Sequence, residues 1–383
     1  MIRVLFIGAP VEPVFAGELG YRERFERTGE NTGNLLIGCS LRRHIACSSY
    51  DHGTMRDPRT VDDEFDLIAI PAANFVFEGF DFGWLADFVE QSTVPCVMVG
   101  LGAQAPSDSD RAIAVPEGTA RFLKIVSERS AAIGVRGEFT ADVLAGLGIE
   151  NVVLTGCPSL YSTVEPRIAV EKTPYHDGLR VSINGSRNVT QHSHSPEAAK
   201  RVAAELLRTA MNRGYEYVLQ DEIPEIDLLF ATELDDLLRE QVWSILARLS
   251  LEVAEDDYFR FVKNHGRLFF SVEEWASHIR TKDFSIGTRF HGNVIALVNG
   301  VPAVVVVHDA RTAELCELTK IPSLGLDADR LRDLRSVYED ADYAGFVSTY
   351  SLLYRRYAAF LEDNGVPHNL SVREAPPVRR ASA

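Results

Sequence analysis

Short apolar runs alternate with helical patterns along the chain. In the first part the runs are rich in Val, Ile and Leu and almost continuously apolar, which is typical of strands buried on both faces of a sheet. The segments between the runs have apolar residues at the spacing of an amphipathic helix. We predict strands at residues 4–7, 67–70, 96–99, 131–135 and 152–154, and helices at 35–44, 82–90, 119–128 and 138–147.

The pattern weakens after Pro158 and then begins again. Residues 165–178 are largely polar and are broken by Pro166 and Pro174, so we place a domain boundary there. A second series of strands and helices follows this segment. We predict strands at 179–184, 215–219, 268–270, 284–286 and 303–307, and helices at 196–212, 234–249, 272–278, 293–298, 312–319 and 342–361.

Strands that alternate with helices indicate parallel sheets with helices on both faces, so the predicted fold class is α/β. We predict two doubly wound Rossmann-like domains that face a cleft, at residues 1–168 and 177–365, followed by a tail at 366–383. Ligands of such sheets bind beside the carboxyl ends of the strands. The loops after the strands are therefore where we expect the functional residues.

The charge of the chain limits its partners. Of 383 residues, 25% are charged, and the formal net charge is −16. Because phosphate contacts dominate nucleic-acid affinity, a chain this acidic is a poor nucleic-acid binder. An anionic substrate must therefore be held by a local cluster of Arg, His and backbone N–H groups.

The cysteines and the first residues bear on the compartment. Five cysteines are scattered without a CxxC pair, which argues against a zinc site and a disulfide framework. Free thiols are typical of a reducing compartment. Residues 1–8 predict a strand rather than a signal peptide, and no apolar run approaches the ~20 residues that span a bilayer. We expect a cytoplasmic protein.

The most informative segment is residues 285–292, where a buried strand end precedes a glycine turn and a helix start. Such a junction directs backbone N–H groups and the positive helix end to one point. Arg289 adds a cation suited to phosphate or carboxylate, and His291 can exchange a proton near neutral pH. The segment predicts a binding and proton-transfer site for a small anion. The alternatives are that Arg289 pairs with a core carboxylate and that His291 is structural.

Three further residues follow predicted strands. Arg187 is in the first loop of the second domain, Arg136 lies between a strand and a helix, and His308 begins the loop after residues 303–307. His308 could join the anion site or orient His291. For Arg187 and Arg136 the alternatives are a solvated loop position and a structural ion pair.

One pair of histidines, His192 and His194, has the spacing of metal ligands but only Glu197 as a nearby acid. Glu197 fits the first turn of the next helix better, and a single His-x-His in a polar loop is a weak signal. We predict no metal site.

Four blocks of the sequence together resemble the polysaccharide pyruvyl transferase family. The last block is similar to the family's Gly-x-Arg-Leu-His motif, with Phe290 in place of Leu. In the third block, Cys157 stands where an Asp is common in the family. The blocks are residues 30–36, 100–104, 133–140 with 155–160, and 287–292 with 300–302.

The resemblance implies a fold similar to GT-B glycosyltransferases and a ketal-forming transferase. Such an enzyme moves the pyruvyl group of phosphoenolpyruvate, its co-substrate, to a sugar of a cell-surface or exopolysaccharide glycan or its precursor. No further cofactor is implied. The expected acceptor is a glycan or a lipid-linked oligosaccharide, and the latter would bring the protein to the inner face of the membrane. Peripheral membrane association and a homo-oligomer are compatible with the sequence.

We predict site residues of three kinds. His291 and Arg289 are the candidates for catalysis, because the resemblance implies that the Arg-x-His element grips phosphoenolpyruvate. The candidates for binding the donor are Arg187, Phe290, Arg136, His308, Gly287 and Thr288. The candidates for binding the acceptor are Asn31, Gly33, Asn34 and Gln104. Amides can bind sugar hydroxyls, but an asparagine before a helix can equally cap it.

Two other functions stay open on the sequence alone. A nucleotide-sugar glycosyltransferase would use similar loops, although no acidic residue is well placed to bind a ribose. The departures at Cys157 and Phe290 would also fit a non-catalytic glycan-binding homologue.

Overall fold

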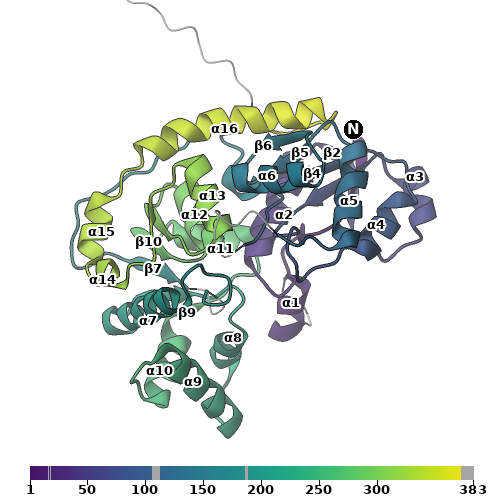
Figure 1. Cartoon of the computed structure of the whole chain (residues 1–383). Helices are drawn as coiled ribbons and strands as arrows, with labels where there is room; N and C mark the ends of the chain where they lie inside the picture. Colours follow the sequence, from purple (N-terminus) through teal and green to yellow (C-terminus); the bar gives the residue numbers. More distant parts are fainter. Residues whose placement is uncertain (16, 18, 106–112, 186–188, 372–383) are drawn as a thin grey trace, which may run out of the picture.

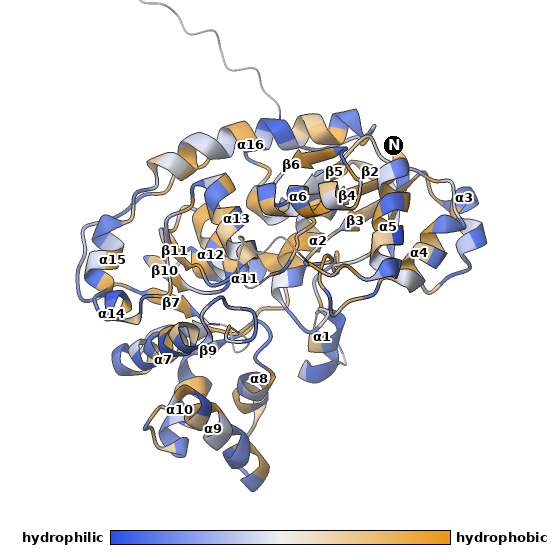
Figure 2. Ribbon diagram, viewed as in Figure 1, coloured by the Kyte–Doolittle hydropathy of each residue, from blue (hydrophilic) through white to orange (hydrophobic). Residues whose placement is uncertain are grey.

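The computed structural model describes residues 1–15, 17, 19–105, 113–185 and 189–371. These residues form two α/β halves, each built around a parallel sheet (Figure 1). The strands are largely apolar and lie inside, whereas polar residues lie on the outer helix faces (Figure 2). The predicted fold class is therefore confirmed.

The sheet of the N-terminal half has the order β2-β1-β3-β4, and all its neighbours are parallel. A parallel pair, β5 and β6, extends it through a bridge between Leu101 and Val135. Every residue of β3 is buried, as expected for a strand covered on both faces. The strands are β1 (Ile2–Phe6), β2 (Cys47–His52), β3 (Leu67–Pro71), β4 (Cys96–Val99), β5 (Ile133–Val135) and β6 (Val152–Leu154).

The helices of this half cover both faces of the sheet. Their apolar faces join the strands in two core clusters. The helices are α1 (Tyr21–Arg27), α2 (Gly33–His44), α3 (Val61–Glu64), α4 (Gly83–Glu90), α5 (Glu117–Glu128) and α6 (Glu138–Gly146), with 3-10 turns at Pro58–Thr60 and Pro158–Tyr161.

The C-terminal half has a six-stranded parallel sheet in the order β12-β11-β10-β7-β8-β9. We predicted a strand at 268–270, but the strand β9 lies earlier, at Gly266–Arg267. Phe270 lies outside the sheet and packs in a small core with Phe25 of α1. The strands are β7 (Val181–Asn184), β8 (Glu216–Val218), β9 (Gly266–Arg267), β10 (Phe284–Gly287), β11 (Ala303–Val306) and β12 (Ser323–Leu324).

Three helices between β8 and β9 form a separate lobe at the bottom of Figure 1. They are α8 (Ile223–Phe230), α9 (Asp236–Leu249) and α10 (Glu255–His265), of which only α9 was predicted. The other helices of this half are α7 (Pro196–Arg213), α11 (Val272–Ile279), α12 (Phe290–Val298), α13 (Ala310–Thr319), α14 (Ala328–Leu331) and α15 (Leu334–Asp340).

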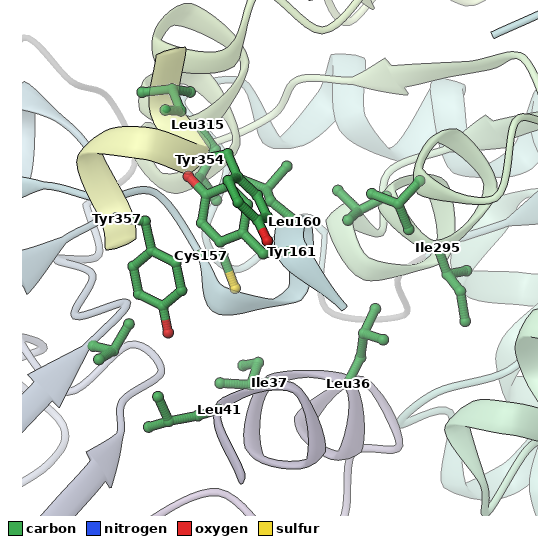
Figure 3. Close-up of a cluster of buried hydrophobic side chains, with 14 of the residues drawn as sticks. Leu36, Ile37, Leu41, Cys157, Leu160, Tyr161, Ile295, Leu315, Tyr354 and Tyr357 are labelled. Carbon is green, nitrogen blue, oxygen red and sulfur yellow. The ribbon is translucent and has the colours of Figure 1, made fainter. Parts of the chain in front are cut away.

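The last helix, α16 (Ala344–Asp363), runs from the C-terminal half over the N-terminal half (Figure 1). Tyr357 of α16 stacks on Tyr161 with ring centroids 4.7 Å apart, beside Leu36 and Leu41 of α2 (Figure 3). The described part of the predicted tail, residues 366–371, returns to the N-terminal half, where Asn369 donates its N–H to the His44 carbonyl. The two halves therefore share one core.

None of the helices in the described part of the chain is both long and apolar enough to cross a bilayer.

Candidate functional site

A narrow cavity of about 90 Å³ lies between the two halves. Eight of its lining residues were predicted from the sequence, namely Asn31, Asn34, Arg136, Thr288, Arg289, Phe290, His291 and His308. The remaining lining residues are Ile37, Ala73, Asn74, Gln220, Arg311, Thr312 and Leu315. These eight predicted residues, from both the donor and the acceptor group, thus meet at one place.

The turn that carries Arg289 and His291 is fixed from behind by two buried asparagines. Asn184 accepts the N–H of Arg289 through its side chain (3.0 Å), and Asn293 donates to the carbonyls of Gly287 and Arg289 (3.0 Å each). A Cβ on Gly287 would overlap the carbonyl oxygen of Asn184, so only glycine allows this approach. Gly287 therefore shapes the turn and does not itself line the cavity.

Arg289 is held by two carboxylates of the loop after β8. Its guanidinium pairs with Asp221 and with Glu222, whose side chain is 2% exposed. This is the carboxylate pairing that the sequence left open for Arg289. Any ligand that uses this guanidinium must share it with the two acids.

His291 lies beside the thiol of Cys157, with Nε2 3.6 Å from Sγ. Burial, together with the positive charges of Arg136, Arg311 and Arg289, lowers the pKa of His291 to about 3. The imidazole is therefore neutral at neutral pH. A Cβ on Gly33 would lie only 3.1 Å from Nδ1, so the glycine leaves room for this face of the ring.

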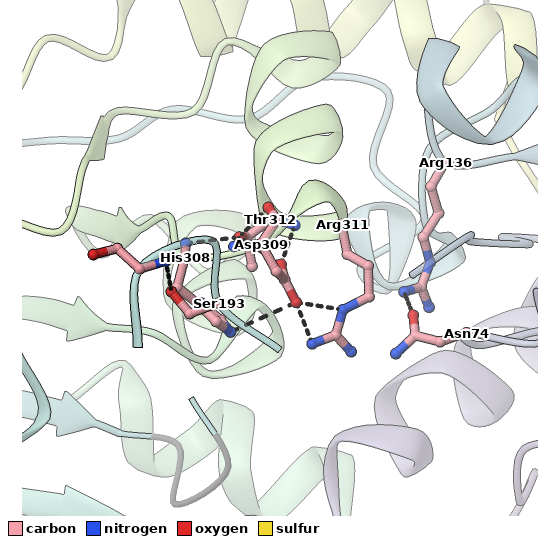
Figure 4. Close-up of polar contacts among 8 residues, drawn as sticks. Asn74, Arg136, Ser193, His308, Asp309, Arg311 and Thr312 are labelled. Atoms are coloured by element: carbon pink, nitrogen blue, oxygen red, sulfur yellow. Dashed lines mark hydrogen bonds and ion pairs between the residues drawn. The ribbon is translucent and has the colours of Figure 1, made fainter. Parts of the chain in front are cut away.

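Arg136 is a buried cation, 4% exposed, in the wall of the cavity. Its Nε donates to the Gly100 carbonyl (2.8 Å), and one Nη donates to Asn74 (2.7 Å; Figure 4). The other Nη is buried and has no hydrogen-bond partner in the part of the chain that the structure describes. Burial lowers the pKa of Arg136. The residue combines a structural anchor with one free donor.

His308 and Arg311 come from the start of α13, where Asp309 is the central group (Figure 4). Asp309 pairs with Arg311 (Nε to Oδ2 2.6 Å), lies 3.6 Å from Nε2 of His308, and caps the helix through the N–H of Thr312. Burial lowers the pKa of His308, and Asp309 opposes that effect. His308 thus lines the cavity, but the described residues show no contact from Asp309 to His291.

The predicted acceptor residues divide into two groups. Asn31 and Asn34 line the cavity, and Asn31 also accepts the N–H of Gly33 (2.8 Å) at the start of α2. The Asn31 side chain therefore stabilises the start of α2 and can also contact a ligand in the cavity. Gln104 is 8% exposed and lies outside the cavity lining. Arg187 lies outside the described residues.

Two site residues were not singled out from the sequence. Gln220 lines the cavity and is 1% exposed, and none of the described residues provides a hydrogen-bond partner for its buried Nε2. Glu314 accepts the N–H of Thr140 (3.0 Å) at the start of α6, and burial raises the pKa of Glu314 to about 7. Gln220 follows a strand, which was the available signal for it. Glu314 is inside a helix and gave no such signal.

His192 packs its ring against Phe77 of the other half, with centroids 5.7 Å apart. Among the described residues, no group of three or more His, Cys, Asp or Glu could hold a metal ion.

The sequence matches the family model for polysaccharide pyruvyl transferase over residues 31–310. This match covers well over half of the 383 residues, so the chain belongs to the polysaccharide pyruvyl transferase family, which is a family of transferases. No curated protein matches the sequence significantly.

Several solved structures are similar to this chain at low sequence identity. UDP-N-acetylglucosamine 2-epimerase from Rickettsia bellii has 12% identity and a TM-score of 0.45, over 95% of this chain and 96% of that chain. The Methanocaldococcus jannaschii UDP-GlcNAc 2-epimerase in complex with UDP-GlcNAc and UDP has 11% identity and a TM-score of 0.44, over 94% and 99%. Anabaena Alr3699/HepE in complex with UDP and glucose has 12% identity and a TM-score of 0.44, over 95% and 96%.

Proposed function

We propose that this protein transfers the pyruvyl group of phosphoenolpyruvate to two hydroxyls of a sugar in a cell-surface or exopolysaccharide glycan or its precursor. Family membership supports the class of reaction. The choice of an anionic donor rests on two buried nitrogen atoms at the cavity that have no hydrogen-bond partner among the described residues, one Nη of Arg136 and Nε2 of Gln220. Leaving buried donors unpaired costs about 1–3 kcal/mol each, so a ligand rich in acceptor oxygens is expected there.

The helix start supplies further donors for this ligand. No side chain caps α12, so its first-turn N–H groups can donate to phosphate oxygens. Arg136 and Arg311 both line the cavity and bring positive charge from opposite halves (Figure 4). A donor that carries both a phosphate and a carboxylate would use both cations.

The reaction balances when both hydroxyl protons of the sugar are accounted for. C3 of the enolpyruvyl group gains a proton and becomes a methyl group, both sugar oxygens bond to C2, and the bond from C2 to the phosphate oxygen breaks. One hydroxyl proton supplies C3 and the other leaves with phosphate. His291 is the proposed carrier, because the charge of the bound donor opposes the three arginines that lower its pKa.

The five cysteines are all free, which supports a reducing compartment, and we propose a cytoplasmic location. A lipid-linked acceptor would bring the protein to the membrane surface.

Calorimetric titration with phosphoenolpyruvate tests the proposal. We expect saturable binding that weakens at least about tenfold in His291→Gln, which corresponds to about 1.4 kcal/mol. His176→Gln is a matched control, because His176 is exposed and lies outside the cavity lining. Binding of UDP-sugars without binding of phosphoenolpyruvate would contradict the proposal and favour a glycosyltransferase.

A further inference from the structure

A second cavity of about 340 Å³ adjoins the first on the N-terminal half and shares Asn34 and Ala73 with it. We call it the aromatic groove. Its lining residues are Ile7, Gly8, Ala9, Pro10, Gly29, Asn34, His52, Gly53, Thr54, Ala73, Phe75, Phe82, Trp84 and Leu85.

The aromatic groove lies at the carboxyl ends of parallel strands. Residues 7–10 follow β1, residues 53–54 follow β2, and Ala73 follows β3. This is the edge at which ligands of parallel sheets bind. Gly8 keeps the floor open: it has a φ of +129°, and a Cβ there would lie 2.9 Å from the Pro71 carbonyl oxygen and 3.5 Å from Phe75. The position and the floor both indicate a binding site rather than a packing gap.

One wall of the groove is a rigid aromatic surface. The rings of Phe75 and Phe82 lie 4.6 Å apart at 33°, and Phe82 is backed by the fully buried Phe122 at 6.2 Å. Trp84, at the start of α4, is 57% exposed at this wall. Trp84 lines the same groove as these two rings, and several apolar side chains gathered in one exposed groove, unlike a single exposed residue, indicate a binding surface.

The charge of the lining narrows the class of ligand. Among the described residues that line the groove none is Lys or Arg, so the groove offers no counter-charge for a second anion. Its polar side chains are Asn34, His52 and Thr54. Asn34 donates to the Thr28 carbonyl and His52 contacts the Gly8 carbonyl (3.3 Å each), and the amide oxygen of Asn34 and the Thr54 hydroxyl have the capacity to bond to ligand hydroxyls. A ligand with one apolar face and hydroxyls along its edge matches both features.

We propose that the aromatic groove binds a hexopyranose ring of the acceptor glycan. The C–H face of the ring packs on Trp84 and Phe82, and its hydroxyl edge points toward Asn34 at the shared wall of the two cavities. A sugar held there presents its hydroxyls to the donor cavity. This inference rests on the proposed function and adds the place and chemistry of acceptor recognition.

The replacement Trp84→Ala tests the inference, because an exposed ring can be removed without opening the core. The probes are methyl β-glucopyranoside, methyl β-galactopyranoside and methyl β-mannopyranoside, followed by saturation-transfer NMR titration. The indole covers the apolar face of the bound sugar, and the burial of apolar surface favours binding. We therefore expect binding to weaken about tenfold.

Trp243→Ala is the matched control, because Trp243 is 63% exposed on α9 in the separate lobe (Figure 1). The inference requires that Trp243→Ala leave glycoside binding unchanged, and that both variants bind phosphoenolpyruvate like the wild type. Equal glycoside binding by Trp84→Ala and the wild type would overturn it. So would an absence of glycoside binding by the wild type up to about 50 mM, a range that includes weak single-sugar affinities.

Two outcomes separate this inference from the proposed function. Phosphoenolpyruvate binding without any glycoside binding overturns the groove and leaves the donor site intact. Glycoside binding that depends on Trp84, without phosphoenolpyruvate binding, supports the groove and removes the proposed donor. Farnesyl phosphate is the probe for a lipid occupant, and Trp84-dependent binding of it in place of the glycosides would overturn the sugar assignment.

Discussion

The neutral state of His291 can be tested by placing a negative charge beside it. Cys157 is the suitable position, because its Sγ lies 3.6 Å from Nε2 of His291 and its side chain is close in size to that of aspartate. The replacement Cys157→Asp therefore introduces a carboxylate at hydrogen-bond range of the ring. An opposite charge so close favours the protonated imidazole and raises its pKa.

The size of the effect follows from the separation. At an effective dielectric constant of about 20, two unit charges about 4 Å apart attract by about 4 kcal/mol, which is about three pKa units at 1.36 kcal/mol each. The guanidinium of Arg136 interacts with the same position and would also attract the new carboxylate, which reduces the effect of the carboxylate on His291. We expect the pKa of His291 to rise from about 3 to between about 5 and 6.

The assay is a titration of the histidine ring protons by NMR between about pH 4 and pH 8, the range in which histidines usually titrate. The chain has ten histidines, so His291→Gln identifies the signal. Cys157→Ser is the control, because it adds no charge and should leave the pKa low. If Cys157→Asp folds and His291 still does not titrate in this range, or if wild-type His291 already titrates near its ordinary value, the reasoning is refuted.

Two further predictions concern stability and are measured by urea titration. Gly287→Ala should reduce the free energy of unfolding by at least about 3 kcal/mol, because the new Cβ overlaps the Asn184 carbonyl. The control is Gly146→Ala, which should be neutral or stabilising, because Gly146 lies at the end of α6 with open space around it. Glu314 has a folded-state pKa of about 7 against an ordinary 4.5, so the folded state holds its proton more tightly, and stability from this group is lost as pH rises from 4.5 to 7. Glu314→Gln should remove this loss of about 3 kcal/mol, so the free energy of unfolding of the variant should rise relative to that of the wild type between pH 5 and pH 8. Parallel pH profiles of the two proteins would contradict this.

The sequence predicted those parts of the fold whose side-chain pattern reflects local burial. The strands at 67–70 and 96–99 were found because they are apolar and buried on both faces. The strand β2 was missed, because its Cys-Ser-Ser-Tyr-Asp-His sequence is polar and lies exposed at the edge of the sheet. The hydrophobic pattern therefore indicates which faces of a strand are buried, and it gives no signal for a strand that is exposed.

The site divides in a similar way. The turn before α12 was predictable because strand, glycine and helix start are consecutive in the chain. The partners of its side chains were not, since Glu222 and Cys157 lie 67 and 134 residues away from the groups that they contact. The contact of Glu222 with Arg289 forms within the C-terminal half, whereas the contact of Cys157 with His291 forms only when the two halves meet.

The position of α16 has a consequence for how the protein is made. His44 is fully buried in the N-terminal half, and its Nδ1 hydrogen-bonds to Tyr357 at 2.9 Å. The other ring nitrogen, Nε2, contacts the Tyr161 carbonyl (2.9 Å), so the N-terminal half alone lacks only the Nδ1 partner and the cover that Tyr357 gives Tyr161. It can complete its own core only after α16 has been translated. Until then the nascent protein exposes an apolar surface that is a natural substrate for chaperones.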